Sequence, residues 1–211
     1  EAPIEALKKI KDKYGIDFDH IFSSETNKYA IDCIRENNNP NILFGDIQKR
    51  NIKDVPDIDV YVSGFPCQPY SRANKFKSEV DPRINLFEDC LKVILEKKPK
   101  CFILENVKTL ETLNNGYYFN QIINRLEDNG SYNVYNKVIN SKDQGIPQCR
   151  ERLYIIGILK SDIKKGFVFP NDLKMKPLEK FIDNTSNEKI DIKPSNYKLF
   201  KNIPENSIFI D

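Results

Sequence analysis

Apolar and polar residues follow two patterns, which alternate along the first 160 positions of the chain. Helical spacing, with apolar residues every three to four positions, predicts helices at residues 3–15, 26–37, 84–98 and 116–130. Short apolar runs predict strands at residues 19–25, 42–46, 59–66, 100–107, 132–141 and 150–159. Because strands and helices largely take turns, we expect an α/β fold, namely a doubly wound, mostly parallel sheet with helices on both faces.

The pattern weakens after Lys160. Residues 161–211 are rich in Lys, Asn, Asp and Pro, and their short apolar clusters follow neither of the two patterns. We therefore expect one main domain over residues 1–160 and the start of a smaller, less regular region over residues 161–211.

Composition narrows the classes of function. The 211 residues include 33 basic and 31 acidic ones, a net charge of +2, so any surface for nucleic acid must be local. No apolar run predicts a membrane span or a secretion signal. Five cysteines in no CxxC pair and a single histidine, His20, argue against a metal site, disulfides and a histidine-based triad. An odd number of thiols is typical of a reducing cytoplasm or nucleus, where we expect the protein to act.

Four acidic or reactive side chains stand where predicted strands end, namely Glu25, Asp46, Cys67 and Glu105. Parallel strands bring their carboxyl ends to one rim of the sheet, where ligands bind in α/β folds. Each residue alone is more commonly a cap or a turn residue, but all four together indicate a site. Two neighbouring carboxylates suit the ribose and the adenine amine of an adenosine-containing cofactor. Cys67 and Glu105 would then face the substrate as a nucleophile and a carboxyl group able to bind a base.

Three motifs give the chain a specific resemblance. GFPCQPYS at residues 64–71, ILENV at 103–107 and GIPQCRERLYIIG at 145–157 resemble, in order and spacing, the catalytic motifs of the DNA (cytosine-5) methyltransferases. FSSETNKYA at 22–30 and FGDI at 44–47 resemble that family's cofactor motifs. The resemblance covers roughly residues 1–160 and extends weakly through residues 167–183, where the family's target-recognition domain opens.

The resemblance implies a mechanism and a role for each matching residue. Cys67 would attack carbon-6 of a flipped-out cytosine, so that carbon-5 accepts the methyl group of S-adenosylmethionine. Glu105 would bind the ring nitrogen and the amino group, Arg152 the base carbonyl, and Arg150 would support Glu105 or the loop. The other implied contacts are Glu25, Thr26, Asp46, Ile47, Pro66 and Leu86 to the cofactor, and Gln68, Ser71, Arg72 and Arg83, in or beside a basic lid at residues 69–83, to double-stranded DNA.

The sequence also departs from the family pattern. The family opens with a strand and a Phe-x-Gly-x-Gly turn, whereas this sequence opens with the helix that follows the turn. In the family that strand lies between the strands that end at Glu25 and at Cys67. We therefore expect two strands with unpaired edges, an incomplete cofactor site, and a need for missing segments or a complementing chain.

Three other functions stay open at this point. One branch of the family methylates tRNA, and GFPCQPYSR is compatible with either nucleic acid. A methyltransferase-like partner without activity would also tolerate an incomplete cofactor loop, although it would not need Cys67, Glu105 and Arg152 together. A NAD-dependent oxidoreductase would suit the fold, but the chain has no Gly-x-Gly-x-x-Gly motif.

Overall fold

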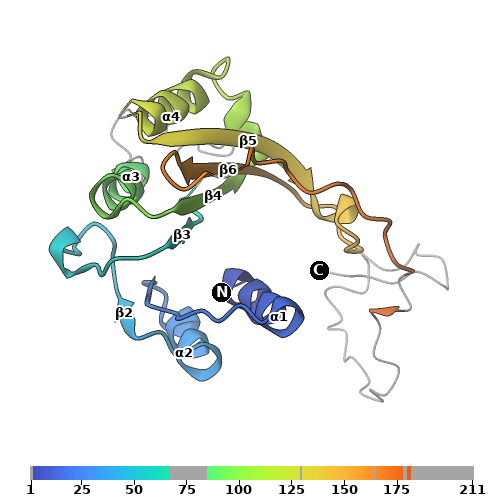
Figure 1. The fold of residues 1–211 in the computed structure, drawn as a ribbon, viewed down its shortest axis with the longest axis horizontal. Helices are drawn as coiled ribbons and strands as arrows, with labels where there is room; N and C mark the ends of the chain where they lie inside the picture. Colours follow the sequence, from blue (N-terminus) through green and yellow to red (C-terminus); the bar gives the residue numbers. More distant parts are fainter. Residues whose placement is uncertain (1, 67–84, 129, 164, 178–179, 182–211) are drawn as a thin grey trace, which may run out of the picture. The chain divides into compact units, whose positions relative to one another are not determined.

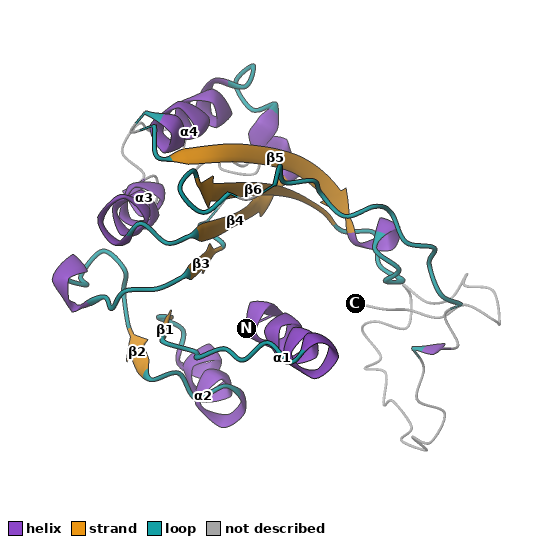
Figure 2. Cartoon of the chain, viewed as in Figure 1, coloured by secondary structure: helices purple, strands orange, loops and turns teal. Residues whose placement is uncertain are grey.

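A computed structural model describes residues 2–66, 85–128, 130–163, 165–177 and 180–181 (Figures 1 and 2). The chain divides into two compact units. The first comprises residues 1–139 and 151–169, and the second comprises residues 140–150 and 170–211. The first unit contains nearly all of the regular secondary structure.

The helices and strands follow the order expected from the sequence. The helices are α1 (Ala2–Tyr14), α2 (Lys28–Asn37), α3 (Asn85–Lys97) and α4 (Tyr117–Glu127). The strands are β1 (Phe22–Ser24), β2 (Ile42–Phe44), β3 (Val60–Ser63), β4 (Cys101–Val107), β5 (Tyr132–Asn140) and β6 (Glu151–Leu159). Three short 3-10 turns also occur in the described part, η1 (Ile52–Asp54), η4 (Lys108–Glu111) and η5 (Ser141–Asp143).

The strands form two sheets. β1 and β2 pair in parallel, and the other four lie in the order β3-β4-β6-β5. β3 runs parallel to β4, whereas β6 runs antiparallel to β4. Backbone bonds link residue 160 to 131 and residue 141 to 150, so β5 and β6 are also antiparallel. The α/β class is confirmed, with a mixed sheet in which β6, the last strand of the described residues, runs opposite to β3, β4 and β5.

The unpaired edges expected beside β1 and β3 are present. Among the described residues, β1 pairs with β2 alone and β3 pairs with β4 alone. On β3, the side chains of Val60 and Val62 are 49% and 37% exposed, although valine is usually buried in folded proteins. Among the described residues, β1 and β3 thus each have an unpaired edge, and β3 also exposes apolar side chains, a combination that promotes association.

The main core lies on one face of the four-stranded sheet. Phe102 and Leu104 of β4 and Leu153 and Ile155 of β6 are fully or almost fully buried there. The helical repeat of α3 and α4 places apolar residues over the same core, namely Phe87, Cys90, Leu91, Val93, Ile94, Ile122 and Leu126 (Figure 1). This packing fixes β4 and β6, the two strands that carry the motif residues.

Gly157 makes room for the largest side chain of this core. It lies directly opposite Phe102 in the β4–β6 register. A methyl group at position 157 would overlap the Phe102 ring, so this strand position accepts no larger side chain. This role could not be predicted from the local pattern, because a glycine in the run YIIGIL could equally mark a bulge.

Helix α2 buries a narrower face than its sequence predicts. The spacing of Tyr29, Ala30, Cys33 and Ile34 predicts that all four line the apolar side. Ile34 is buried, but Tyr29 is 83% exposed and Cys33 is also exposed. The prediction is therefore wrong for Tyr29 and Cys33, because the short β1–β2 sheet offers this helix little surface to pack on.

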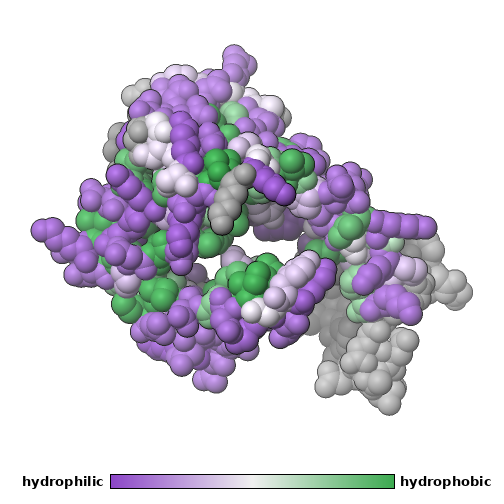
Figure 3. Space-filling view, in the orientation of Figure 1, coloured by the Kyte–Doolittle hydropathy of each residue, from purple (hydrophilic) through white to green (hydrophobic). Residues whose placement is uncertain are grey.

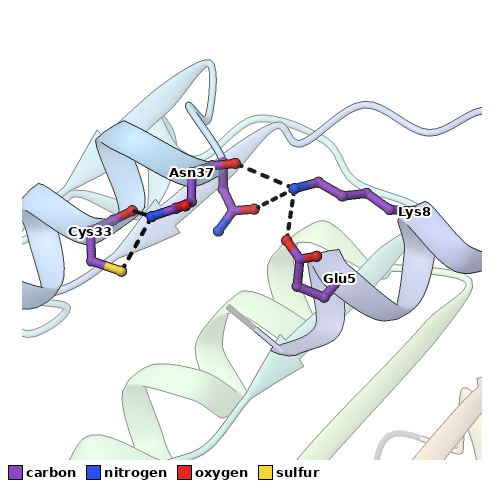
Figure 4. Close-up of polar contacts among 5 residues, drawn as sticks. Glu5, Lys8, Cys33 and Asn37 are labelled. Atoms are coloured by element: carbon purple, nitrogen blue, oxygen red, sulfur yellow. Dashed lines mark hydrogen bonds and ion pairs between the residues drawn. The ribbon is translucent and has the colours of Figure 1, made fainter. Parts of the chain in front are cut away.

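Polar contacts join helix α1 to helix α2. None of its side chains is buried, and its apolar residues remain visible at the surface (Figure 3). Lys8 forms an ion pair with Glu5 at 2.7 Å and donates to the Asn37 carbonyl and to Asn38 Oδ1 at the end of α2 (Figure 4). One lysine thus joins the first helix to the second.

The second unit contains a turn and an extended segment. Asn140 Oδ1 accepts the backbone N–H groups of Lys142 and Arg150, both at 3.2 Å. The Leu173 N–H donates to the Asp143 carbonyl at 2.7 Å, beside a parallel bridge between Gln144 and Leu173. The described residues of this unit therefore hold together by backbone bonds over residues 140–150 and 173.

Candidate active site

Glu105 and Arg152 form the centre of the candidate site. Glu105 lies inside β4, two residues before its end, and Arg152 is the second residue of β6. The register pairs Glu105 with Tyr154 and Val107 with Arg152, so the two charged residues are diagonal neighbours on one face. Arg152 Nε lies 3.0 Å from Glu105 Oε1, with 23% and 31% of the side chains exposed. A half-buried, charge-assisted contact of this kind fixes the orientation of both groups.

The segment that leads to Cys67 passes beside this pair. A Cβ atom placed on Gly64 would lie 3.4 Å from Glu105 Oε2, so the Gly64 backbone is next to the carboxylate. The absence of a side chain at position 64 allows this close approach. Cys67 itself lies outside the described residues, as do Gln68, Ser71, Arg72 and Arg83.

Asn106 holds the same segment from the other face of β4. Its side chain is buried, and its amide nitrogen donates to the Phe65 carbonyl at 3.1 Å. Asn106 was not among the site residues predicted from the sequence. Its signal was a polar amide inside the apolar run CFILENV, since a buried amide must find partners.

Glu25 and Asp46 leave the same end of the small parallel sheet. The register pairs Ser24 with Phe44, and the Glu25 N–H donates to the Phe44 carbonyl at 3.1 Å. Glu25 Oε1 accepts the backbone N–H groups of Thr26 at 2.8 Å and of Asn27 at 2.9 Å. The carboxylate is therefore held in one orientation by the turn that begins α2.

Asp46 is held in a similar way after β2. Its Oδ1 accepts the Gln48 N–H at 3.0 Å, and its Oδ2 lies 3.8 Å from the exposed Lys49 ammonium group. Burial raises the pKa of the nearby Asp89 carboxyl, and the negative charge of Asp46 acts in the same direction. The negative charge of Asp46 thus acts on Asp89.

The remaining residues expected at the cofactor have different surroundings. Thr26 and Pro66 are exposed, Leu86 is half-buried at the start of α3, and Ile47 packs against the core. The exposed side chain of Thr26, next to Glu25 in the chain, is open to a ligand, whereas Ile47 is partly committed to packing.

Arg50 joins β1 to the loop after β2, and it was not among the site residues predicted from the sequence. Its Nη1 donates to Ser24 Oγ at 2.7 Å, immediately before Glu25. Its guanidinium also lies 5.2 Å from the ring centroids of both Phe22 and Phe44. Stacking on two rings together with a hydrogen bond keeps Arg50 in place between the two strands. No local pattern could reveal this role, because its hydrogen-bond partner, Ser24 of β1, lies 26 residues earlier.

Cys90 is not a plausible nucleophile, although it lies close to the end of β3. Its thiol is buried, 3.2 Å from Ser63 Oγ. Burial raises the pKa of the Cys90 thiol and of the Tyr61 hydroxyl that packs beside it. A buried, protonated thiol reacts poorly because the thiolate is the reactive form.

Arg150 belongs to the second unit. Its backbone N–H reaches Ser141 Oγ at 3.2 Å and its carbonyl accepts the Ser141 N–H at 3.0 Å. These bonds fix the main chain just before β6 begins.

The described residues lack two kinds of feature. No group of three or more His, Cys, Asp or Glu side chains is placed to hold a metal ion there. Within the same part of the chain, no helix is long and apolar enough to cross a membrane.

Comparison with known sequences identifies the family. Residues 6–209 match the profile described as C-5 cytosine-specific DNA methylase. The chain belongs to this family. It is 44% identical over 182 residues to the type II methyltransferase M.HaeII of Haemophilus aegyptius, covering 85% of this chain and 54% of that protein. It is 41% identical over 153 residues to M.NlaX of Neisseria lactamica, covering 72% of this chain and 48% of that protein.

Solved structures confirm the fold of this C-5 cytosine methylase chain. A mutant DNMT2 from Spodoptera frugiperda superposes with a TM-score of 0.64 at 22% identity, over 85% of this chain and 56% of that one. The methyltransferase EhMeth of Entamoeba histolytica gives a TM-score of 0.62 at 24% identity, over 79% of this chain and 52% of that one. At these identities the likeness concerns the fold alone.

The family confirms two expectations from the sequence. The resemblance to DNA (cytosine-5) methyltransferases is correct, and the family supports S-adenosylmethionine as the methyl donor. The chain spans about half the length of the curated relatives it matches.

Proposed function

We propose that the protein carrying this chain transfers a methyl group from S-adenosylmethionine to carbon-5 of cytosine in double-stranded DNA. The observation that carries the proposal is the Glu105–Arg152 contact beside Gly64, three residues before Cys67. A base-binding carboxylate and the segment with the thiol then come from adjacent strands, β4 and β3. The matching family profile and the type II methyltransferase relatives support the same reaction.

The proposed reaction begins with Cys67. Its thiolate forms a bond to carbon-6 of a cytosine that has left the base stack. Carbon-5 then takes the methyl group, and the donor leaves as S-adenosylhomocysteine. Loss of the carbon-5 proton restores the ring double bond and expels the thiolate, which leaves the enzyme unchanged.

Glu105 and Arg152 would stabilise the charge that builds in the ring. The Glu105 carboxyl would bind the ring nitrogen and the amino group, and the Arg152 guanidinium the base carbonyl. Their contact at 3.0 Å supports these roles because each group limits the rotation of the other. Arg150 would support the loop from its position just before β6.

Glu25 and Asp46 would hold the adenosine of the cofactor. Both follow parallel strands at one sheet end, and backbone N–H groups orient both carboxylates. Thr26, Ile47, Pro66 and Leu86 would line the same ligand. Among the described residues, β1 and β3 each keep one edge without a paired strand, so we propose that a further segment, in the same protein or a second chain, completes the cofactor site.

The DNA contacts would come from Gln68, Ser71, Arg72 and Arg83. With the type II methyltransferases among its relatives, we propose that the protein serves restriction-modification and acts inside the cell, where its DNA lies.

A trapping experiment tests this function. The intact protein is incubated with S-adenosylmethionine and duplex DNA containing 5-fluorocytosine, and in parallel with a tRNA that carries the same base. We expect a covalent adduct with DNA that Cys67→Ser abolishes and Cys90→Ser leaves in place, because Cys90 is buried. Adduct formation that survives Cys67→Ser would exclude Cys67 as the nucleophile. Trapping on tRNA alone would move the substrate from DNA to RNA.

A further inference from the structure

A second ion pair stands beside Glu105 and Arg152. The β4–β6 ladder ends at the pair Val107–Arg152, and Lys108 is the next residue along the chain. Lys108 Nζ lies 2.5 Å from Glu151 Oε2, and Glu151 is the first residue of β6. This ion pair therefore lies at the end of the β4–β6 ladder, next to Arg152.

A continuous chain of contacts leads from this pair to the base-binding carboxylate. Lys108 holds the side chain of Glu151, and the Glu151 carbonyl accepts a hydrogen bond from Arg152 Nη1 at 2.8 Å. Arg152 Nε in turn contacts Glu105 at 3.0 Å. The Arg152 guanidinium is thus fixed on one side by the Glu151 backbone and on the other by the Glu105 carboxylate.

Charge order makes the arrangement specific. In the first pair the acidic residue, Glu105, lies on β4 and the basic residue, Arg152, lies on β6. In the second pair the order is reversed, because the basic Lys108 follows β4 and the acidic Glu151 lies on β6. A shift of β6 along β4 would bring like charges together. The Lys108 and Glu151 side chains are 51% and 42% exposed, and ion pairs that exposed contribute little to stability. The Lys108–Glu151 pair would then serve to position neighbouring groups and not to stabilise the fold.

We infer that Lys108 and Glu151 are positioning residues that hold Arg152 against Glu105 during methyl transfer. The inference rests on the proposed function for its catalytic part, and on the contacts alone for its geometric part. It predicts that losing either partner lets the end of the ladder open, so that the guanidinium no longer keeps one orientation.

The first test measures geometry without relying on activity. In the intact protein, the solvent exchange of the Arg152 Nε–H is followed by NMR in the wild type, Lys108→Met and Lys100→Met. Lys100 is a matched control, because it pairs with Asp59 at 2.6 Å beside the other end of β4 and is also exposed. We expect faster exchange in Lys108→Met alone. Equal exchange in all three proteins would overturn the inference, whether or not the protein methylates DNA.

The second test measures catalysis. We expect Lys108→Met and Glu151→Gln each to lower kcat by about 10- to 100-fold, the effect of a small misplacement of a reacting group. In an Arg152→Lys background, adding Lys108→Met should change kcat by less than about twofold, because residues acting through one group are not additive. Full multiplication of the two losses would overturn the inference. A wild-type protein with no methylation at all would instead contradict the proposed function.

Discussion

The Asn106 side chain donates a hydrogen bond to the Phe65 carbonyl, and both residues are buried. The bond joins the interior of β4 to the main chain two residues before Cys67. The side-chain oxygen of Asn106, Oδ1, accepts the Val107 N–H at 2.9 Å, so both the nitrogen and the oxygen of the side-chain amide form hydrogen bonds. The position of the segment that carries the nucleophile thus depends on one side-chain amide in the neighbouring strand.

Replacing Asn106 should therefore lower both stability and activity. Asn106→Ala removes a donor and leaves the buried Phe65 carbonyl unsatisfied, which costs about 1–3 kcal/mol of the free energy of unfolding. Asn106→Asp should cost more, because it places a carboxylate against a carbonyl in a buried position. Urea denaturation of the two variants measures the order. An Asn106→Asp protein as stable as the wild type would contradict the role of the donor.

Glu25 and Asp46 should determine affinity for the cofactor. We expect Glu25→Gln or Asp46→Asn to weaken S-adenosylmethionine binding by about 1–3 kcal/mol, the cost of a lost hydrogen bond in a closed site. The amides can still accept the backbone bonds that the carboxylates accept, so the fold should persist. Calorimetry on the intact protein measures the effect, with Asp57→Asn as the control because Asp57 is 97% exposed. Unchanged affinity in both variants would refute the assignment of the cofactor site.

Gly157 should tolerate no side chain. Gly157→Ala forces the new methyl group into the Phe102 ring, and overpacking of a core of this kind costs about 1–3 kcal/mol. Gly45→Ala is the control, since nothing lies within 4 Å of the added atom. Thermal unfolding should separate the two variants clearly. If both melt at the wild-type temperature, then β4 and β6 pack less tightly than described.

The unpaired edges of β1 and β3 should make the isolated chain prone to aggregate. When these 211 residues are expressed alone, we expect the chain to be inactive and poorly soluble, because unpaired strand edges pair with strands of other chains. Supplying a further strand, fused or as a separate chain, should restore solubility and methyl transfer. Val62→Lys should reduce light scattering by the isolated chain, whereas Val168→Lys, already exposed in a loop, should not. A soluble, active monomer of this length would disprove the prediction.

The sequence was sufficient for features that depend on neighbouring residues. Periodicity located α3 and α4, and the apolar run around ILENV located β4, because burial on one face leaves a local repeat. The contact between Arg152 and Glu105, however, was not predicted, because the motifs assign Arg152 to the base carbonyl and Arg150 to the support of Glu105 or the loop. The prediction that Glu105 stands at the end of a parallel strand is also incomplete, because β4 continues past it to Val107 and pairs antiparallel with β6.

Features that depend on distant residues could not be predicted. Asn106 finds its acceptor 41 residues away, and Lys108 finds Glu151 43 residues away. Tyr29 lies on the apolar side of its helix by spacing, yet the neighbouring sheet is too small to cover it. In each case the partner, and not the local pattern, decides the role of the residue.

The Glu25 carboxylate has a second task, because its Oε1 accepts the N–H groups of Thr26 and Asn27, just ahead of α2. A ligand bound to this carboxylate would hold it still and thereby tighten the first turn of the helix. Occupancy of the site should then be visible far from any reacting atom, as slower amide hydrogen exchange along residues 28–31.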